Sequence, residues 1–407
     1  MRKAVLVSLD AFFVKDTENL DPEGFLARML REGAFCRRVE TVFPALTYPI
    51  HVTMVTGCDP DRTGVGQNQP LQPDVPKDRR VWYWERKHIR VPTLFDAVKA
   101  AGGQNCSILW PVGCRNRAVK RCFPEVHPLR GENAVLKVLR YGSPLYILRE
   151  EKAFGHLRKG IQEPFLSDYA SAVAADTIRR HCPDFTAVHL IDLDDARHRH
   201  GTFSPEAGEA IGRNDRRLAD LYRAVAETPG MRDALLIAVS DHGQEDIRKT
   251  VNLTRLLRQR GLDRLLAVQS NGMSACFFPG PEYQETGAPE TLLPESLWQE
   301  AGISRLYSRK DLDDLHAVAG PLFAAEAAEG VVFSDALDEE KREAATHGFG
   351  PGRDADLCLF AVFGKGVKAG TEIPSMSMRD VGPTIAGLMG LKLAEADGTD
   401  LSSLFLA

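Results

Sequence analysis

The chain has 407 residues, of which 43% are apolar, and its formal net charge is −5 at neutral pH. This length suits a large α/β domain that carries an insertion, and the apolar fraction is normal for a globular core. The weak negative charge gives no basic footprint for nucleic acid, and no apolar stretch approaches the roughly 20 residues of a membrane span. We therefore expect no specific nucleic-acid binding and no membrane association.

Helices are predicted from capping signals and from apolar residues at helical spacing, over residues 20–35, 91–101, 166–182 and 204–228, with another beginning near Pro49. Buried strands are predicted from short, mainly apolar runs at 4–9, 106–110, 187–193, 235–239 and 356–363, and a further strand is predicted near 38–41. Such alternation is typical of a wound, mostly parallel α/β sheet. Residues 113–165 are less regular and rich in Arg and Lys, and we expect them to form a lid.

Three of the predicted strands end in a carboxylate. The first ends at Asp10, the strand 187–193 ends at Asp194 with His198 four residues on, and the strand 235–239 leads to Asp241 and His242. A single Asp-His-Gly turn is an ordinary helix cap, but parallel strands bring their carboxyl ends to one edge. Anions that converge there repel one another unless a cation lies among them. The repetition therefore predicts a metal site.

A segment with two prolines, residues 43–57, contains a candidate reactive hydroxyl. A helix that starts at Pro49, a favoured first-turn residue, would place Thr47 at or near the N-cap with its hydroxyl facing out. The alternative is that Thr47 only caps the helix. Downstream, the aromatic cluster at 81–84 could stack a planar group, although covering the core is the favoured role.

The later chain has a different character. Residues 251–345 contain short strands at 265–269 and 274–278, an Ala- and Glu-rich stretch expected to be helical, and many charges. We interpret them as an inserted cap subdomain, with residues 1–250 and 346–407 forming the catalytic core. A loop that contains His347 and Gly348 opens the second part of the core, and a final core helix begins near Ser377.

Together these motifs resemble the nucleotide pyrophosphatase/phosphodiesterase (type I phosphodiesterase) family of the alkaline phosphatase superfamily. The matching elements occur in the family's order and are Asp10, Thr47-Tyr48-Pro49, Asp194 with His198 and Gly201, Asp241-His242-Gly243, and His347-Gly348. The resemblance implies an alkaline-phosphatase-like three-layer α/β/α sandwich. It also implies hydrolysis of phosphodiester or pyrophosphate bonds through a phosphothreonine intermediate.

The resemblance further implies a two-zinc site. One zinc would take Asp194, His198 and His347, and the other would take Asp10, Asp241 and His242 with the Thr47 oxygen as its reactive ligand. Imidazole and carboxylate donors suit Zn²⁺, with Mn²⁺ or another divalent metal as the alternative. A neutral threonine hydroxyl is a poor nucleophile and needs a cation to form its alkoxide.

Several positions depart from the family pattern. Ile50 occupies a position where the family often has an asparagine that contacts the phosphoryl group, and Asn68, or an amide of the lid, is the candidate replacement. Arg197 replaces a usual glycine. Because spacing alone does not fix loop geometry, His200 and Asp195 remain alternatives to His198 and Asp194. The other histidines, at 51, 88, 127, 156, 181, 189 and 316, are expected to be structural or solvent-exposed.

Two other functions remain open from the sequence. A phosphonate hydrolase of the phosphonoacetate type shares the ligand order, and Ile50 favours a metal-binding protein without turnover. The eight cysteines contain no Cys-x-x-Cys pair, and the apolar run after Arg2-Lys3 is too short for a signal peptide. We therefore expect reduced thiols and a cytoplasmic location. Together with threonine as the nucleophile, the absence of a signal sequence points to a small intracellular diester or pyrophosphate substrate, such as a nucleotide or a small phosphodiester.

Overall fold

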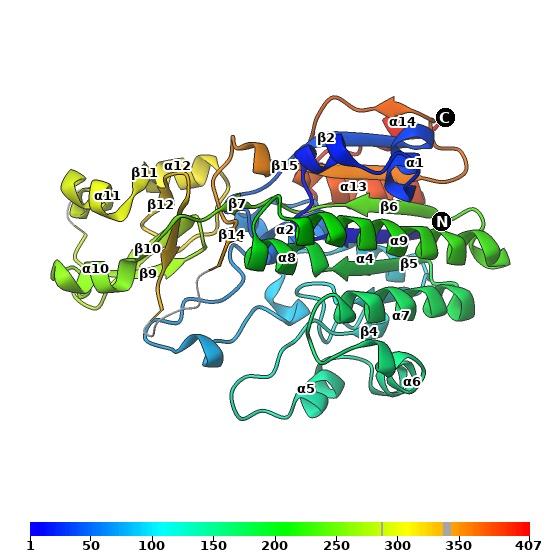
Figure 1. The fold of residues 1–407 in the computed structure, drawn as a ribbon, viewed down its shortest axis with the longest axis horizontal. Coiled ribbons are helices and arrows are strands. Elements are labelled where there is room, and N and C mark those ends of the chain that lie inside the picture. The colour runs from blue at the N-terminus through cyan, green and yellow to red at the C-terminus, as the bar shows by residue number, and fades with distance from the viewer. Residues whose placement is uncertain (286–287, 337–342) are drawn as a thin grey trace.

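The computed structural model describes residues 1–285, 288–336 and 343–407. Its centre is a nine-stranded sheet in the order β16-β2-β15-β6-β1-β5-β3-β4, with β17 also paired to β2 (Figure 1). The strands are β1 (Ala4–Leu9), β2 (Ala34–Glu40), β3 (Asn105–Ile108), β4 (Val119–Phe123), β5 (Phe185–Leu190), β6 (Leu235–Val239), β15 (Leu357–Phe363), β16 (Thr371–Glu372) and β17 (Met376–Ser377). Only β15 of these described strands runs antiparallel to its neighbours, so the sheet is mostly parallel, as predicted.

Helices cover both faces of this sheet and make a three-layer sandwich. One face packs against α2 (Thr47–Thr56), α4 (Leu94–Ala100), α13 (Met378–Met389) and α14 (Ser402–Phe405). The other packs against α1 (Phe25–Glu32), α7 (Phe165–His181), α8 (Asp192–His200) and α9 (Pro205–Glu227). Within β1, Ala4 and Leu6 enter the first core, whereas Val5 and Val7 enter the second. Burial on both faces explains the continuous apolar run of this strand.

Two sequence predictions near the site need correction. The strand predicted over 187–193 ends at Leu190, and α8 begins at Asp192, so Asp194 lies in the first turn of a helix. Three carboxylates in that turn favour the helix, because its N-terminus carries a partial positive charge. The helix expected to start near Pro49 begins two residues earlier, at Thr47.

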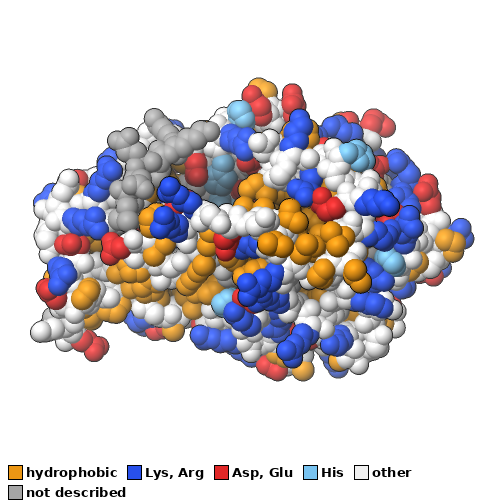
Figure 2. Space-filling view, turned by 90° about the horizontal axis from the view of Figure 1, so that it is seen from below, with side chains coloured by type: hydrophobic (Ala, Val, Ile, Leu, Met, Phe, Trp, Pro, Cys, Tyr) orange, Lys and Arg blue, Asp and Glu red, His pale blue; other side chains and the backbone are white. Residues whose placement is uncertain are grey.

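The prediction that residues 113–165 form a lid is also wrong. Strand β4 extends the main sheet beyond β3, and α5 (Ala134–Tyr141) and α6 (Pro144–Phe154) follow it. Helix α6 packs on β4 and α7. The outer face of α5 and α6 exposes apolar side chains among basic ones, as the view from below shows (Figure 2), namely Val135, Leu136, Leu145 and Leu148.

A second, antiparallel sheet lies at one end of the molecule (Figure 1). Its order is β11-β12-β10-β9, from β9 (Leu266–Ser270), β10 (Ser274–Pro279), β11 (Ile303–Tyr307) and β12 (Phe323–Ala327). Around it lie α10 (Leu253–Gln259), α11 (Glu295–Ala301) and α12 (Arg309–Asp314). The chain segments that precede and follow this sheet in the sequence pair with each other in two short ladders. These are β8 (Lys249–Asn252) with β13 (Val331–Ser334), and β7 (Glu245–Asp246) with β14 (Ala345–Thr346).

The Ala- and Glu-rich stretch expected to be helical is partly strand. Phe323–Ala327 forms β12, which is buried along its whole length, and packing between neighbouring strands overrides the helix propensity of alanine. The rest of the stretch includes residues 337–342, which lie outside the described residues. The domain division at 250/251 and 345/346 stays a prediction. Among the described helices, none is both long and apolar enough to cross a bilayer.

Candidate active site

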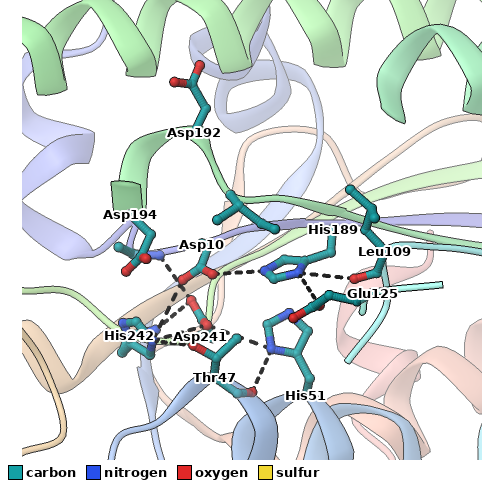
Figure 3. A network of polar contacts seen from close by, with 12 residues as sticks. Asp10, Thr47, His51, Leu109, Glu125, His189, Asp192, Asp194, Asp241 and His242 are labelled. Carbon is teal, nitrogen blue, oxygen red and sulfur yellow. Dashed lines mark hydrogen bonds and ion pairs between the residues drawn. The ribbon is translucent and has the colours of Figure 1, made fainter. Parts of the chain in front are cut away.

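Asp10 and Asp241 leave neighbouring strands at the same edge of the main sheet. Strands β1 and β6 pair in parallel with Ser8 opposite Val239, so the chain brings the two carboxylates out side by side. The ligand atoms of Asp10, Asp241 and His242 all lie within 4.8 Å of one another, and all three residues are buried. Figure 3 shows these side chains pointing toward a common centre.

A second group shares His242 with the first. The ligand atoms of Asp194, His242 and His347 lie within 4.8 Å of one another. The Nε2 of His198, one helical turn after Asp194 on α8, is 3.4 Å from Asp194 Oδ1. The ring of His347 stacks on that of His242 with the centroids 3.8 Å apart. The six protein ligands predicted for two metals therefore converge, with His242 between the two groups.

The three histidines of these groups are oriented alike by the backbone. The Nδ1 of each faces a backbone carbonyl, which can only accept a hydrogen bond, so Nδ1 carries the proton and Nε2 keeps its lone pair for a metal. The pairs are His198 with Ala345 at 2.9 Å, His242 with Gly243 at 3.2 Å and His347 with Ala45 at 3.0 Å.

The residues present fit a divalent cation. Asp10 Oδ1 and Asp241 Oδ2 are buried without a hydrogen-bond partner, a costly arrangement for a carboxylate. Burial and the neighbouring charges of Asp241 and Asp194 raise the pKa of Asp10 well above its usual value. Burial and the nearby His347 lower the pKa of His242, which favours the neutral imidazole that binds metals. Carboxylate oxygens and imidazole nitrogens in this arrangement are a donor set suited to zinc.

Thr47 begins α2 and faces the first metal-ligand group. Its Oγ1 is 3.2 Å from His242 Nε2. Leu46 occupies the N-cap position of the helix, and its side chain makes no capping hydrogen bond. The alternative that Thr47 only caps the helix is therefore wrong.

Ile50 and Asn68 differ in their relation to the site. Ile50 is fully buried in the core between the sheet and its covering helices, so its side chain does not face the site. The Oδ1 of Asn68 accepts a hydrogen bond from the Tyr48 amide at 2.9 Å, which holds the Asn68 loop against the first turn of α2. Asn68 also lines the neighbouring cavity.

The alternative ligands point elsewhere. His200 is exposed and lies 3.7 Å from Glu206, and Asp195 pairs with Arg199 on the outer side of α8. Arg197 is fully buried: it donates to the carbonyls of Ala11 and Thr202 and pairs with Asp16. The unusual arginine thus fixes the turn after Asp10 without interrupting α8.

His51 and His189, expected to be structural or solvent-exposed, lie in the site. The Nδ1 of His51 donates to the Thr47 carbonyl at 2.8 Å and is 3.7 Å from Asp241 Oδ2, while burial lowers its pKa to about 3. His189 lies between Asp10 and Glu125. The available signals were a histidine within the apolar strand β5 and another one turn after Thr47.

A cavity of about 550 Å³ opens beside His198 and His347. Asn68 and Trp82 line this cavity. The cations Lys77, Arg80 and Arg255 are also among its lining residues. Arg80 forms a buried ion pair with Asp335 in the cavity wall. The aromatic cluster therefore has two roles, because Trp84 is buried in a core cluster whereas Trp82 faces the cavity.

Comparison with known proteins shows the family to which the chain is related. A model of the type I phosphodiesterase/nucleotide pyrophosphatase family matches residues 4–349. Human ectonucleotide pyrophosphatase/phosphodiesterase family member 1 is 22% identical over 272 residues, 62% of this chain and 25% of the relative. The mouse protein is 23% identical over 302 residues, 70% of this chain and 28% of the relative. The chain thus spans about a quarter of the length of these relatives.

Solved structures confirm the predicted alkaline-phosphatase-like α/β fold. Human ectonucleotide pyrophosphatase/phosphodiesterase 5 superposes with a TM-score of 0.74 at 18% identity, covering 100% of both chains. An inactive variant of the mouse protein in complex with AMP gives a TM-score of 0.72 at 16% identity, also over 100% of both chains. Since the family model extends from the first core strand through His347, the chain belongs to the type I phosphodiesterase/nucleotide pyrophosphatase family.

Proposed function

We propose that this protein is a two-metal phosphodiesterase or nucleotide pyrophosphatase that acts on small molecules through a phosphothreonine at Thr47. The observation that carries the proposal is the position of the Thr47 hydroxyl, 3.2 Å from the Nε2 of His242, the residue common to both metal-ligand groups. A hydroxyl held against cation sites is placed to lose its proton and act as a nucleophile.

The ligands are assigned to two divalent ions. Asp10, Asp241, His242 and the Thr47 oxygen would hold one, and Asp194, His198 and His347 would hold the other. Zinc is the preferred metal because the donors are imidazole nitrogens and carboxylate oxygens, with manganese as the alternative. When bound, two such ions stabilise the charge on the attacking and leaving oxygens of a displacement at phosphorus.

The residues of the chain account for the covalent steps. Thr47 Oγ1 gives up its proton to solvent and bonds to phosphorus, the bond from phosphorus to the leaving oxygen breaks, and that oxygen keeps the electron pair and takes up a proton. Water then attacks the phosphothreonine and loses a proton, the bond between phosphorus and Oγ1 breaks, and Oγ1 takes up a proton. Asn68, held beside Thr47 by its bond to the Tyr48 amide, is the proposed contact for a phosphoryl oxygen.

The cavity beside the site supports a nucleotide as substrate. Its volume of about 550 Å³ is within the usual range for small-molecule sites. Cations such as Arg255 suit phosphate, and the indole of Trp82 suits a planar group. AMP is bound by the mouse structural neighbour, which is consistent with this class of ligand.

Metal analysis paired with hydrolysis tests the proposal. The purified protein should contain two metal ions per chain and cleave bis(p-nitrophenyl) phosphate, and chelation should abolish cleavage until metal is restored. p-Nitrophenyl phosphate and phosphonoacetate are the comparison substrates. Preference for phosphonoacetate would favour a phosphonate hydrolase, and two metals without any turnover would favour a binding protein. A protein without metal would contradict the whole assignment.

We also propose a reducing compartment, the cytoplasm. The support is that all eight cysteines are free thiols. Reducing conditions keep such thiols free, whereas cysteines of secreted proteins are usually oxidised to disulfides. Fractionation of the source cells with an antibody to the protein would test the location.

A further inference from the structure

A buried series of polar contacts leads from Asp10 to the residue next to the proposed nucleophile. The Nε2 of His189 donates to Asp10 Oδ2 at 2.9 Å, and its Nδ1 donates to Glu125 Oε2 at 3.1 Å. The hydroxyl of Tyr48 donates to the other oxygen of Glu125 at 3.0 Å. His189 lies on β5 and Tyr48 on α2, whereas Asp10 and Glu125 follow the ends of β1 and β4. Figure 3 shows His189 between the two carboxylates.

His189 has only acceptors around its two ring nitrogens. Besides the two carboxylates, the carbonyl of Leu109 lies 3.2 Å from Nδ1. The ring is therefore held from both sides, at Nε2 by Asp10 and at Nδ1 by Glu125. The side chain is 1% exposed, so its hydrogen bonds lie in a region of low dielectric.

The contact with His189 divides the two oxygens of Asp10 between different roles. Oδ2 is occupied by the imidazole of His189, whereas Oδ1 has no hydrogen-bond partner and lies 3.7 Å from His242 Nε2. A carboxylate held at one oxygen presents the other in a fixed direction. Groups that orient a metal ligand from behind commonly control how tightly the metal binds.

We propose that His189, held in turn by Glu125, is a positioning residue that fixes the Asp10 carboxylate so that Oδ1 alone faces the metal. The inference rests on the proposed function, because it requires a metal bound by Asp10. Glu125 also accepts from Tyr48, whose amide is bonded to Asn68, so the same contacts connect Asp10 with the first turn of α2.

Replacement of His189 tests this role through metal affinity. In His189→Gln one amide group replaces the two ring nitrogens, so the zinc affinity of the site that includes Asp10 should fall roughly 10- to 100-fold, with the other site unchanged. His189→Leu removes both donors and should lose more. In both variants kcat should fall at limiting zinc and recover at saturating zinc, with little change in KM for the diester.

Glu125→Gln is the second, gentler variant, because this side chain is 19% exposed and the amide nearly preserves its shape. A smaller loss of zinc affinity is expected. His316→Gln is the matched control, since His316 also contacts a carboxylate, that of Asp61 at 3.3 Å, but is 52% exposed. It should leave zinc affinity and kcat unchanged.

The measurement is a titration of the chelator-stripped full chain with zinc against a chromogenic chelator, alongside thermal unfolding. Lower thermal stability with wild-type zinc affinity in the His189 and Glu125 variants would show a merely structural role and overturn the inference. If the His189 variants do not fold, Glu125→Gln decides. If the wild-type protein is active and holds two metals while the variants keep its zinc affinity, the role of His189 is wrong but the proposed function stands. If the wild-type protein holds no metal, both the role of His189 and the proposed function are wrong.

Discussion

Two carboxylate oxygens, Asp10 Oδ1 and Asp241 Oδ2, are buried without a hydrogen-bond partner in the described structure. The other oxygen of each has partners: Asp10 Oδ2 contacts His189, and Asp241 Oδ1 accepts from the amides of Ala11 and His242. A buried, unpartnered carboxylate oxygen is costly, and a cation removes the cost. At the scale of single residues, the site is therefore arranged for a metal.

Asp241→Asn should lose metal and activity together. Asparagine can still accept from the two backbone amides through Oδ1, but it places an NH₂ group where the unpartnered oxygen lies. We expect metal content to fall from two ions toward one per chain. Asp356→Asn is the control, because Asp356 is a buried carboxylate that accepts from Thr41 outside the site. Unchanged zinc content in Asp241→Asn, measured by elemental analysis, would contradict the assignment.

Thr47→Ala should abolish turnover while metal content stays near two ions per chain. The attacking oxygen is removed, so we expect kcat to fall by about 10³-fold or more, while Asp10, Asp241 and His242 remain to hold the metal. Thr47→Ser should keep part of the activity, and Thr53→Ala, on the same helix with its hydroxyl bonded to the Cys58 carbonyl, should be active. Rapid-quench detection of a phosphothreonine gives the direct measurement. Retained activity in Thr47→Ala would remove Thr47 from its role.

At the scale of elements, the second sheet holds one of the metal-ligand loops in place. The turn between β9 and β10 contacts the loop that carries His347: the Met273 amide donates to the His347 carbonyl at 2.9 Å. Gly348 has φ +90, and an added Cβ would lie 1.6 Å from the Asn271 carbonyl oxygen. The His347 loop therefore needs a glycine where it meets this turn.

Gly348→Ala should displace His347 and weaken metal binding by the Asp194 group. Gly352→Ala is a matched control, because Gly352 also has a positive φ, +98, but no heavy atom lies within 4 Å of an added Cβ. We expect the control to cost about 1 kcal/mol through backbone strain alone and to retain two metals. Zinc titration and thermal unfolding of both variants test this. Equal behaviour of the two would mean that the contact with Asn271 does not position His347.

The stability of the whole molecule should depend on pH through Glu163, near the start of α7. Burial raises the pKa of Glu163 to about 7 from 4.5. Between these values the folded chain binds more protons than the unfolded chain, so the free energy of unfolding falls as pH rises through this window. The stability of Glu163→Gln relative to wild type should therefore increase between pH 4.5 and 8, by up to about 3 kcal/mol. Denaturant unfolding measures it, with the exposed Glu18→Gln as control. If the difference in the free energy of unfolding between Glu163→Gln and wild type did not change with pH, this prediction would be wrong.

Most of the main sheet could be predicted because the signal for each buried strand lies within that strand's own residues. Central strands buried on both faces need continuous apolar runs, and those of β1 and β6 are evident in the sequence. Strand β12 was not predictable, since its alanines favour a helix until neighbouring strands bury them. Strand β4 carries charges and was mistaken for part of a lid.

The sequence by itself determined the fold class, the nucleophile candidate and the metal-ligand candidates. The apolar runs that end near Asp10 and Asp241 indicate the strands and their ligands, and the order of the motifs along the chain indicates the fold class and the nucleophile. Only the tertiary structure decided which neighbours complete the site. His51, Glu125 and His189 lie far apart along the chain, and their contacts depend on the order of the strands and on side-chain direction. Such contacts leave no periodic signal in a sequence, because they arise when separate elements meet at one edge of a sheet.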